Sequence, residues 1–135
     1  MPDLFRGFTG PTAEPEVHLL PQGFTGAVAL QHGVPDAPAL SYEGAARVYQ
    51  IDETGQLHTR DSLNVGIRPP GRARYFFVSP DGSGQRTPIP LERDAPTPQT
   101  IAILGGYPVH DTFHYFVDTP ENRGRYPHPA IDEER

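Results

Sequence analysis

The 135-residue chain contains no cysteine, no lysine and no tryptophan. Without cysteine it has no disulfide, no thiolate nucleophile and no cysteine-based zinc or iron–sulfur site. No apolar run approaches the roughly 18 residues of a membrane span, and the first residues lack the apolar core of a signal peptide. We therefore expect no membrane span, a cytoplasmic location if Met1 is the native start, and a cell-envelope location if a signal segment has been removed.

The charge balance is acidic. Seventeen Asp and Glu face eleven basic residues, all of them arginine, which gives a net charge of −6. Because phosphate neutralisation needs a basic surface, we expect no nucleic-acid partner. Another protein is the expected partner, and its identity and the oligomeric state of the chain stay open.

The fold class follows from short apolar runs separated by turn residues. The chain has 17 prolines and 14 glycines, and its seven Phe and six Tyr lie mostly beside Val, Ile or Leu. Strands of period two bounded by Pro, Gly, Asp and Asn are typical of all-β domains. We predict one antiparallel β-sandwich, immunoglobulin-like or transthyretin-like, with seven or eight short strands and at most one helical turn, at residues 119–122.

Three segments carry most of this prediction. RARYFFV (72–78) is the strongest strand, with Ala73, Tyr75 and Phe77 on one face. Residues 46–51 and 56–60 flank the turn sequence DETG and are predicted to form a hairpin. The segment QRTPIPL (85–91) has two prolines that cannot donate to a ladder, which favours an edge strand.

Three regions are expected along the chain: a Gly/Pro-rich arm (1–15), the β-sandwich (16–120) and an extended tail (121–135). Leu4, Phe5 and Phe8 of the arm are expected to pack onto the domain, and a partner-binding arm is the alternative. The sequence GFTG occurs at residues 7–10 and again at residues 23–26. We interpret both copies as turns, in which glycine adopts positive φ and phenylalanine fills an apolar gap.

No constellation of catalytic or ligand-binding residues stands out. His110 and His114 have the spacing of helical metal ligands, but on a strand they lie about 13 Å apart. No serine lies in a nucleophile elbow, and the neighbours His58, Asp61 and Ser62 are interpreted as a self-bonded polar loop. DGSG (81–84) is interpreted as a hairpin turn. We therefore assign no catalytic, cofactor-binding or metal residue.

One cluster is a candidate interaction patch. Arginines lie beside aromatic residues within IRPPGRARYFF, a composition typical of protein-interface hot spots. The alternative is a solvated sheet face on which arginine stems lie over the rings. The predicted patch consists of Arg68, Arg72, Arg74, Tyr75 and Phe76.

Four motifs in order resemble those of a family of uncharacterised bacterial β-domains, many of them attached as lipoproteins. They are LPQGFTGAV (20–28), VYQIDETGQLHT (48–59), YFFV (75–78) and FHYFVDT (113–119), and the resemblance covers residues 17–120. It implies a small sandwich-like all-β domain and no assigned activity. The chain departs from the family in lacking the lipoprotein leader with its acylated cysteine, and in having Asp52 where proline is common.

These observations favour a non-catalytic protein-interaction or binding module. The alternatives are a structural component of an envelope or particle assembled by strand-edge pairing, an immunity-type inhibitor of a toxin, and an enzyme of unrecognised type. An enzyme would require a pocket in which His and carboxylate side chains converge with shifted pKa values.

Overall fold

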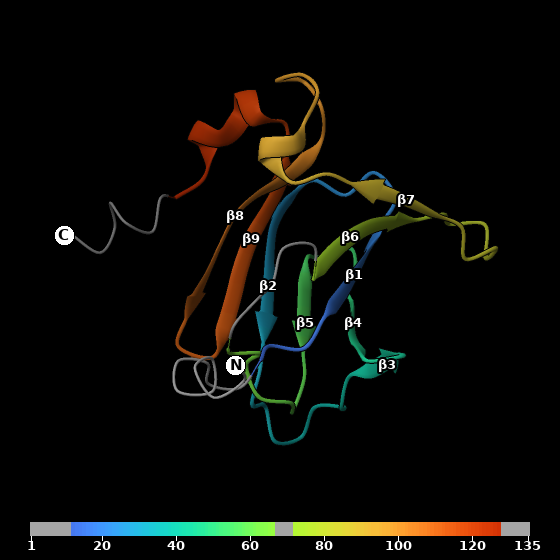
Figure 1. Cartoon of the computed structure of the whole chain (residues 1–135), viewed down its shortest axis with the longest axis vertical. Helices are drawn as coiled ribbons and strands as arrows, with labels where there is room; N and C mark the ends of the chain where they lie inside the picture. The colour runs from blue at the N-terminus through green and yellow to red at the C-terminus, as the bar shows by residue number, and fades with distance from the viewer. Residues whose placement is uncertain (1–11, 67–71, 128–135) are drawn as a thin grey trace, which may run out of the picture.

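The computed structural model describes residues 12–66 and 72–127, which form nine strands in two facing sheets (Figure 1). One sheet has the order β3 (Ser41–Glu43), β4 (Ala46–Gln50), β1 (Glu16–Pro21), β6 (Ala73–Val78), β7 (Arg86–Ile89). The other has the order β5 (Gln56–His58), β2 (Gly26–Gln31), β9 (Thr112–Asp118), β8 (Ala102–Val109). Two short 3-10 helices, η1 (Glu92–Asp94) and η2 (Pro120–Arg125), are the helices of the described residues. Neither is long and apolar enough to cross a bilayer.

The predicted all-β sandwich is confirmed, but the prediction that it is antiparallel is wrong at its centre. β1 pairs in parallel with both β4 and β6, and β2 pairs in parallel with β5, so both sheets are mixed. The strand count is nine rather than seven or eight. Of the turn predicted at residues 119–122, Thr119 is the N-cap of η2 and residues 120–122 are its first three residues; η1 is an addition to the prediction.

The parallel pairs arise because the chain makes the same crossing twice. β1 leads through residues 22–25 to β2 in the opposite sheet, and β4 leads through residues 51–55 to β5 in that sheet. The two crossings therefore stack, β4 beside β1 and β5 beside β2. The hairpin predicted around DETG is accordingly wrong. The turn itself forms, with the Asp52 carboxylate accepting from the Thr54 N–H at 2.9 Å, but Ile51 and Leu57 on either side enter the same core between the sheets.

The GFTG at residues 23–26 is the first of these crossings, and its predicted role is confirmed. Gly23 and Gly26 have φ of 84° and 121°, a region that favours glycine, and the Phe24 ring packs against the core. Gly55 of the second crossing packs against the first crossing: a Cβ at Gly55 would stand 2.2 Å from the Ala27 carbonyl oxygen and 2.9 Å from the Phe24 ring. The two crossings thus touch at a position where only a hydrogen atom fits.

The central strand β1 is buried on both faces. Val17 and Leu19 form a cluster with Val48 on the side of the sheet away from the second sheet. Glu16, His18 and Leu20 alternate with them and are 5%, 0% and 1% exposed. Alternation along β1 therefore places one carboxyl group and one imidazole inside the sandwich.

The hairpin of β6 and β7 and the edge position of β7 are both as predicted. The Asp81 carboxylate accepts from the Ser83 N–H at 2.8 Å and shapes the turn. Pro88 pairs with Phe76 on the outermost strand, so a group that cannot donate lies on this sheet edge.

Both ends of the described chain lie against the domain. Of the predicted arm, residues 12–15 are described, and Ala13 is 1% exposed. Of the predicted tail, residues 121–127 are described, and the Tyr126 ring stacks on Phe116 at a centroid distance of 4.5 Å. Leu4, Phe5, Phe8 and the first GFTG lie outside the described residues.

We expect Gly55→Ala to lower the unfolding free energy of the sandwich more than Gly82→Ala does. Gly82→Ala is a control at a glycine with the same backbone conformation. Both glycines have φ near +80°, but a Cβ at Gly82 meets nothing within 4 Å. The control should lose about 1–2 kcal/mol of unfolding free energy from backbone strain alone, and Gly55→Ala at least about 2 kcal/mol more. Urea denaturation measures both values; equal losses would contradict the stacked crossings.

Candidate functional site

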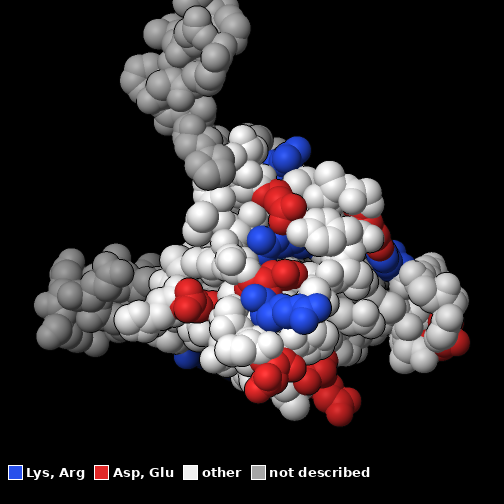
Figure 2. All heavy atoms as spheres, turned by 90° about the horizontal axis from the view of Figure 1, so that it is seen from below, with Lys and Arg blue, Asp and Glu red and all other residues white. Residues whose placement is uncertain are grey.

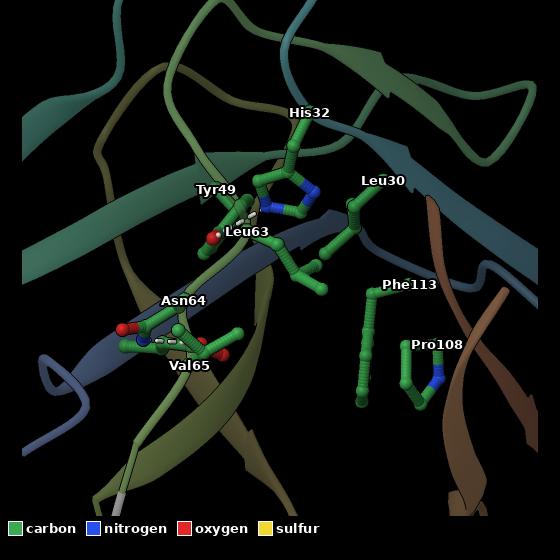
Figure 3. Close-up of a pocket in the computed structure, with 9 residues that line it drawn as sticks. Leu30, His32, Tyr49, Leu63, Asn64, Val65, Pro108 and Phe113 are labelled. Atoms are coloured by element: carbon green, nitrogen blue, oxygen red, sulfur yellow. Dashed lines mark hydrogen bonds between the residues drawn. The ribbon is translucent and has the colours of Figure 1, made fainter. Parts of the chain in front are cut away.

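A pocket of about 210 Å³ lies between the sheets, near the start of β1 and the end of β2 (Figure 3). Its walls are mainly apolar, and its polar groups come from both sheets and from the loop after β5. The apolar lining residues are Leu30, Leu63, Val65, Pro108 and Phe113; the polar ones are Glu16, His32, Tyr49 and Asn64.

The loop of residues 59–66 closes one side of the pocket and is fixed by hydrogen bonds. The Thr59 hydroxyl donates to the Pro38 carbonyl at 2.9 Å, and the Asp61 carboxylate accepts from the Leu40 N–H at 2.9 Å. The Asp61 N–H donates to the Thr59 hydroxyl at 3.2 Å within the loop. The predicted self-bonded loop is thus formed only in part, because His58 is the last residue of β5 and the Asp61 carboxylate bonds to Leu40. These bonds hold Leu63, Asn64 and Val65 against the pocket.

Behind the pocket, a buried imidazole connects the two sheets. His18 on β1 bonds through Nε2 to the Glu16 carboxyl at 2.8 Å and through Nδ1 to the Tyr115 hydroxyl of β9 at 2.9 Å. Because a carboxylate only accepts, Nε2 carries the proton in the first bond. The ring also stacks on Tyr49, with the centroids 4.8 Å apart, and contacts Tyr75 at 4.4 Å.

Asn64 extends this network into the pocket lining. Its side-chain amide donates to the second Glu16 oxygen at 2.7 Å and to the Glu14 carbonyl at 2.8 Å. Its amide oxygen accepts from the Glu14 N–H at 2.8 Å. Both protons of the Asn64 amide nitrogen are therefore committed to the protein.

A second chain of hydrogen bonds runs through His32. Nδ1 donates to the Asp111 carbonyl at 3.1 Å, because a carbonyl only accepts, and Nε2 therefore accepts from the Tyr49 hydroxyl at 2.9 Å. Arg47 donates in turn to the Tyr49 oxygen at 3.2 Å. Burial lowers the pKa of His32 from its usual value of 6.5. The arrangement suits the neutral ring.

Arg47 on β4 donates hydrogen bonds to two other segments of the chain. Its Nε donates to the Glu14 carboxylate at 2.6 Å and its Nη1 to the Ser62 carbonyl at 2.7 Å. The hydrogen bond from Arg47 lowers the pKa of Glu14, which keeps that carboxyl group ionised. The guanidinium thus ties β4 to the segment before β1 and to the pocket loop.

The side-chain donors of the polar lining residues Tyr49, His32 and Asn64 are engaged within the protein. The Tyr49 hydroxyl donates to His32, the His32 Nδ1–H to Asp111 and the Asn64 amide to Glu14 and Glu16. The pocket therefore offers a ligand mainly apolar walls.

The predicted interaction patch is brought together only in part. Arg74 is exposed and lies over Phe76, with its guanidinium carbon 5.8 Å from the ring centroid. Tyr75 is 8% exposed and points into the core, so including it was wrong: on β6 the aromatic residues alternate between faces. Arg72 is half-buried, and Arg68 lies outside the described residues.

The structure adds Arg86 to this surface. Its guanidinium also lies 5.8 Å from the Phe76 centroid and pairs with Glu43, across the sheet on β3. An open groove of about 440 Å³ runs beside Phe76 and is lined by residues of β6, β7 and η1, including Arg74, Pro88 and Arg93. We call Arg74, Phe76 and Arg86 the arginine–phenylalanine surface.

Sequence reasoning missed the pocket residues and the network behind them. The signal was the polar pair Glu16 and His18 in the apolar run EVHLL, on one face of a strand. His110 lies at the hairpin tip with φ 55° and His114 lies on β9. Among the described residues, no three His, Cys, Asp or Glu side chains gather as metal ligands.

Fold and pocket define a small all-β sandwich domain with a cavity between its mixed sheets. Residues 12–110 match a family of unknown function, DUF6843, and the chain belongs to that family. The predicted resemblance to a family of uncharacterised domains is thereby confirmed; three of the four motifs lie within the matched residues, and FHYFVDT (113–119) lies after them. No curated protein matches the chain.

A solved structure shows the same fold. A crystal structure named "Putative Lipoprotein from Bacillus anthracis" is similar to the chain, with a TM-score of 0.54 and 20% sequence identity. The similarity covers 90% of this chain and 89% of that one.

We expect Tyr115→Phe to cost about 1–3 kcal/mol of unfolding free energy, because it leaves a buried His18 nitrogen without its hydroxyl partner. Tyr107→Phe is the control: this half-buried tyrosine stacks on His114 and packs with Phe116 on the face of the four-stranded sheet away from Tyr115, and the change should cost less than about 0.5 kcal/mol. Thermal and urea denaturation measure the difference. A Tyr115→Phe variant as stable as Tyr107→Phe would contradict the proposed inter-sheet role of His18.

Proposed function

We propose that the protein is a non-catalytic binding module of the bacterial cell envelope that takes up a small ligand between its sheets. The observation that carries this proposal is the pocket of about 210 Å³, which has five apolar lining residues and a polar end fixed by internal hydrogen bonds. Apolar walls with a few convergent polar groups are typical of small-molecule sites.

The fixed polar groups favour binding over catalysis. The pocket does contain the convergence that an enzyme requires, since His32 and Glu16 both line it and the pKa of His32 is lowered. Both ring nitrogens of His32, however, already bond to Tyr49 and Asp111. A general base must reach a substrate proton, and His32 would have to break one of these bonds to do so.

The envelope location is supported by two observations. The family motifs resemble those of lipoprotein-attached domains, and the Bacillus anthracis protein of the same fold is named a "Putative Lipoprotein". The charge distribution fits a ligand other than nucleic acid: Figure 2 shows acidic and basic side chains interspersed on the face seen from below, not gathered into one basic surface.

Val65→Trp should abolish ligand binding. Val65 is 62% exposed and lines the pocket, so a larger side chain there occludes the pocket without removing core contacts. Val109→Trp is the matched control, because Val109 is 46% exposed and is not among the pocket-lining residues.

The measurement is a two-dimensional NMR titration with a library of small uncharged and charged compounds. We expect hits that shift the resonances of Leu30, His32 and Phe113 in the wild type and in Val109→Trp, but not in Val65→Trp. A library without a single hit at these resonances would refute the proposed function.

A second candidate function is docking of a protein partner on the arginine–phenylalanine surface. It is favoured by the groove of about 440 Å³ beside Phe76 and by the exposed guanidinium of Arg74 above that ring. Arginine and aromatic side chains are enriched among interface hot spots. An acidic or carboxylate-bearing partner suits Arg74 and the neighbouring Arg93.

Arg74→Glu should weaken retention of such a partner at least about tenfold in a pull-down read by mass spectrometry, because it reverses the charge beside the groove. Arg60→Glu, an exposed arginine outside the groove lining, is the control and should leave retention unchanged. Equal retention by the two variants would remove this surface from consideration.

A further inference from the structure

We propose that the N-terminal arm of the same chain closes the pocket, with the Phe8 ring inserted between the sheets in competition with the ligand. This inference rests on the proposed function, because it assigns a regulator to the same pocket. Residues 1–11 lie outside the described residues. Three observations favour this segment as the occupant: the position at which the described chain begins, the size of the pocket and the repeated sequence GFTG.

The described chain begins beside the pocket. Ala13 is 1% exposed, and the backbone of Glu14 bonds twice to the Asn64 side chain. The Glu14 N–H donates to the Asn64 amide oxygen at 2.8 Å, and the Glu14 carbonyl accepts from the Asn64 amide nitrogen at 2.8 Å. Asn64 and the next residue, Val65, line the pocket. Phe8 precedes Glu14 by a length of chain that spans up to about 20 Å, so the pocket is within its reach.

The pocket has the size of one aromatic side chain. An apolar cavity of about 150 Å³ holds benzene, which is the ring that a phenylalanine carries. The pocket measures about 210 Å³, and Figure 3 shows four of its aliphatic lining residues, Leu30, Leu63, Val65 and Pro108. A phenyl ring requires no hydrogen bond, so it suits a pocket that offers mainly apolar walls.

The sequence around Phe8 is also that of a turn inside the domain. The GFTG at residues 23–26 has glycines at φ 84° and 121° and packs the Phe24 ring against the core. Residues 7–10 have the same four amino acids. Because glycine tolerates positive φ, we expect the two glycines around Phe8 to allow the same turn. Phe5 has no glycine beside it and is therefore the matched control within the arm.

An occupant that belongs to the same chain competes with a free ligand. A short linker between two binding groups holds the second group at an effective concentration of the order of millimolar. The ligand must therefore displace the Phe8 ring, which weakens ligand binding without abolishing it. Removal of the ring should strengthen ligand binding.

The first experiment detects Phe8 in the pocket of the full chain by NMR. We expect nuclear Overhauser contacts from the Phe8 ring protons to the methyl groups of Leu30 and Leu63, with equal strength in dilute and concentrated samples. Phe8→Ala should remove these contacts, and Phe5→Ala should retain them. The absence of contacts between Phe8 and these methyl groups would overturn the inference. Contacts that arise only between two copies of the chain would overturn it as well.

The second experiment measures the effect of the arm on binding, with benzene as an apolar probe that fits the pocket. We expect Phe8→Ala to bind benzene at least about tenfold more tightly than the wild type and Phe5→Ala. The Leu30 and Leu63 methyl resonances report the binding. Equal benzene affinities of the three proteins would overturn the regulatory role of Phe8.

The outcomes separate this inference from the proposed function. If Phe8 shows no contact with the pocket and the compound library gives hits, the inference is wrong and the proposed function stands. If the contacts are present and the library shifts no pocket resonance even in Phe8→Ala, the proposed function is wrong and only the docking of the arm stands.

Discussion

The imidazole of His18 is the polar contact on which the arrangement of the two sheets depends. It is 0% exposed, and its two nitrogens reach a carboxyl group on its own strand and a hydroxyl group on the opposite sheet. A buried polar group without its partner costs about 1–3 kcal/mol. The two sheets therefore have one relative position in which His18, Glu16 and Tyr115 are satisfied together, and that position leaves the pocket beside Glu16.

The stacked crossings supply the geometry that this contact needs. Because β1 and β4 run in parallel and cross to β2 and β5 in the same way, Tyr49 of β4 lies beside His18 of β1 and faces His32 at the end of β2. A hairpin at DETG would have placed β5 next to β4 in one sheet. The parallel arrangement instead provides residues for the pocket from both sheets. Packing of the core and formation of the pocket are thus consequences of one topology.

Period-two alternation made much of the fold predictable from the sequence. It identified β6 and the edge strand β7, and the turn chemistry of GFTG was apparent because glycine and phenylalanine have separate, local roles there. The direction of pairing was not predictable, since DETG forms the same local turn whether the chain returns beside β4 or crosses to the other sheet. That choice depends on Gly55 packing under Phe24, a contact between residues 31 positions apart.

The candidate site was harder to predict from the sequence, because it too depends on contacts between residues far apart in the chain. Its polar residues come from β1, β4, the end of β2 and the loop after β5, and no two of them form a motif. Arginine beside aromatic residues suggested an interaction surface on β6. In the structure Tyr75 points into the core because side chains alternate along the strand, and Arg86 of the paired strand β7 lies over Phe76 on that surface. The local pattern thus identified a surface, whereas the pocket required the complete topology.

The central claim is that internal hydrogen bonds fix the polar groups behind and within the pocket. Nitrogen-15 NMR of the histidine side chains tests it most directly, because it reports which ring nitrogen carries a proton. The account predicts an Nε2 proton on His18 that is protected from exchange, and a neutral His32 with its proton on Nδ1 at pH 7. Rapidly exchanging imidazole protons on both residues, or a charged His32 at that pH, would contradict it.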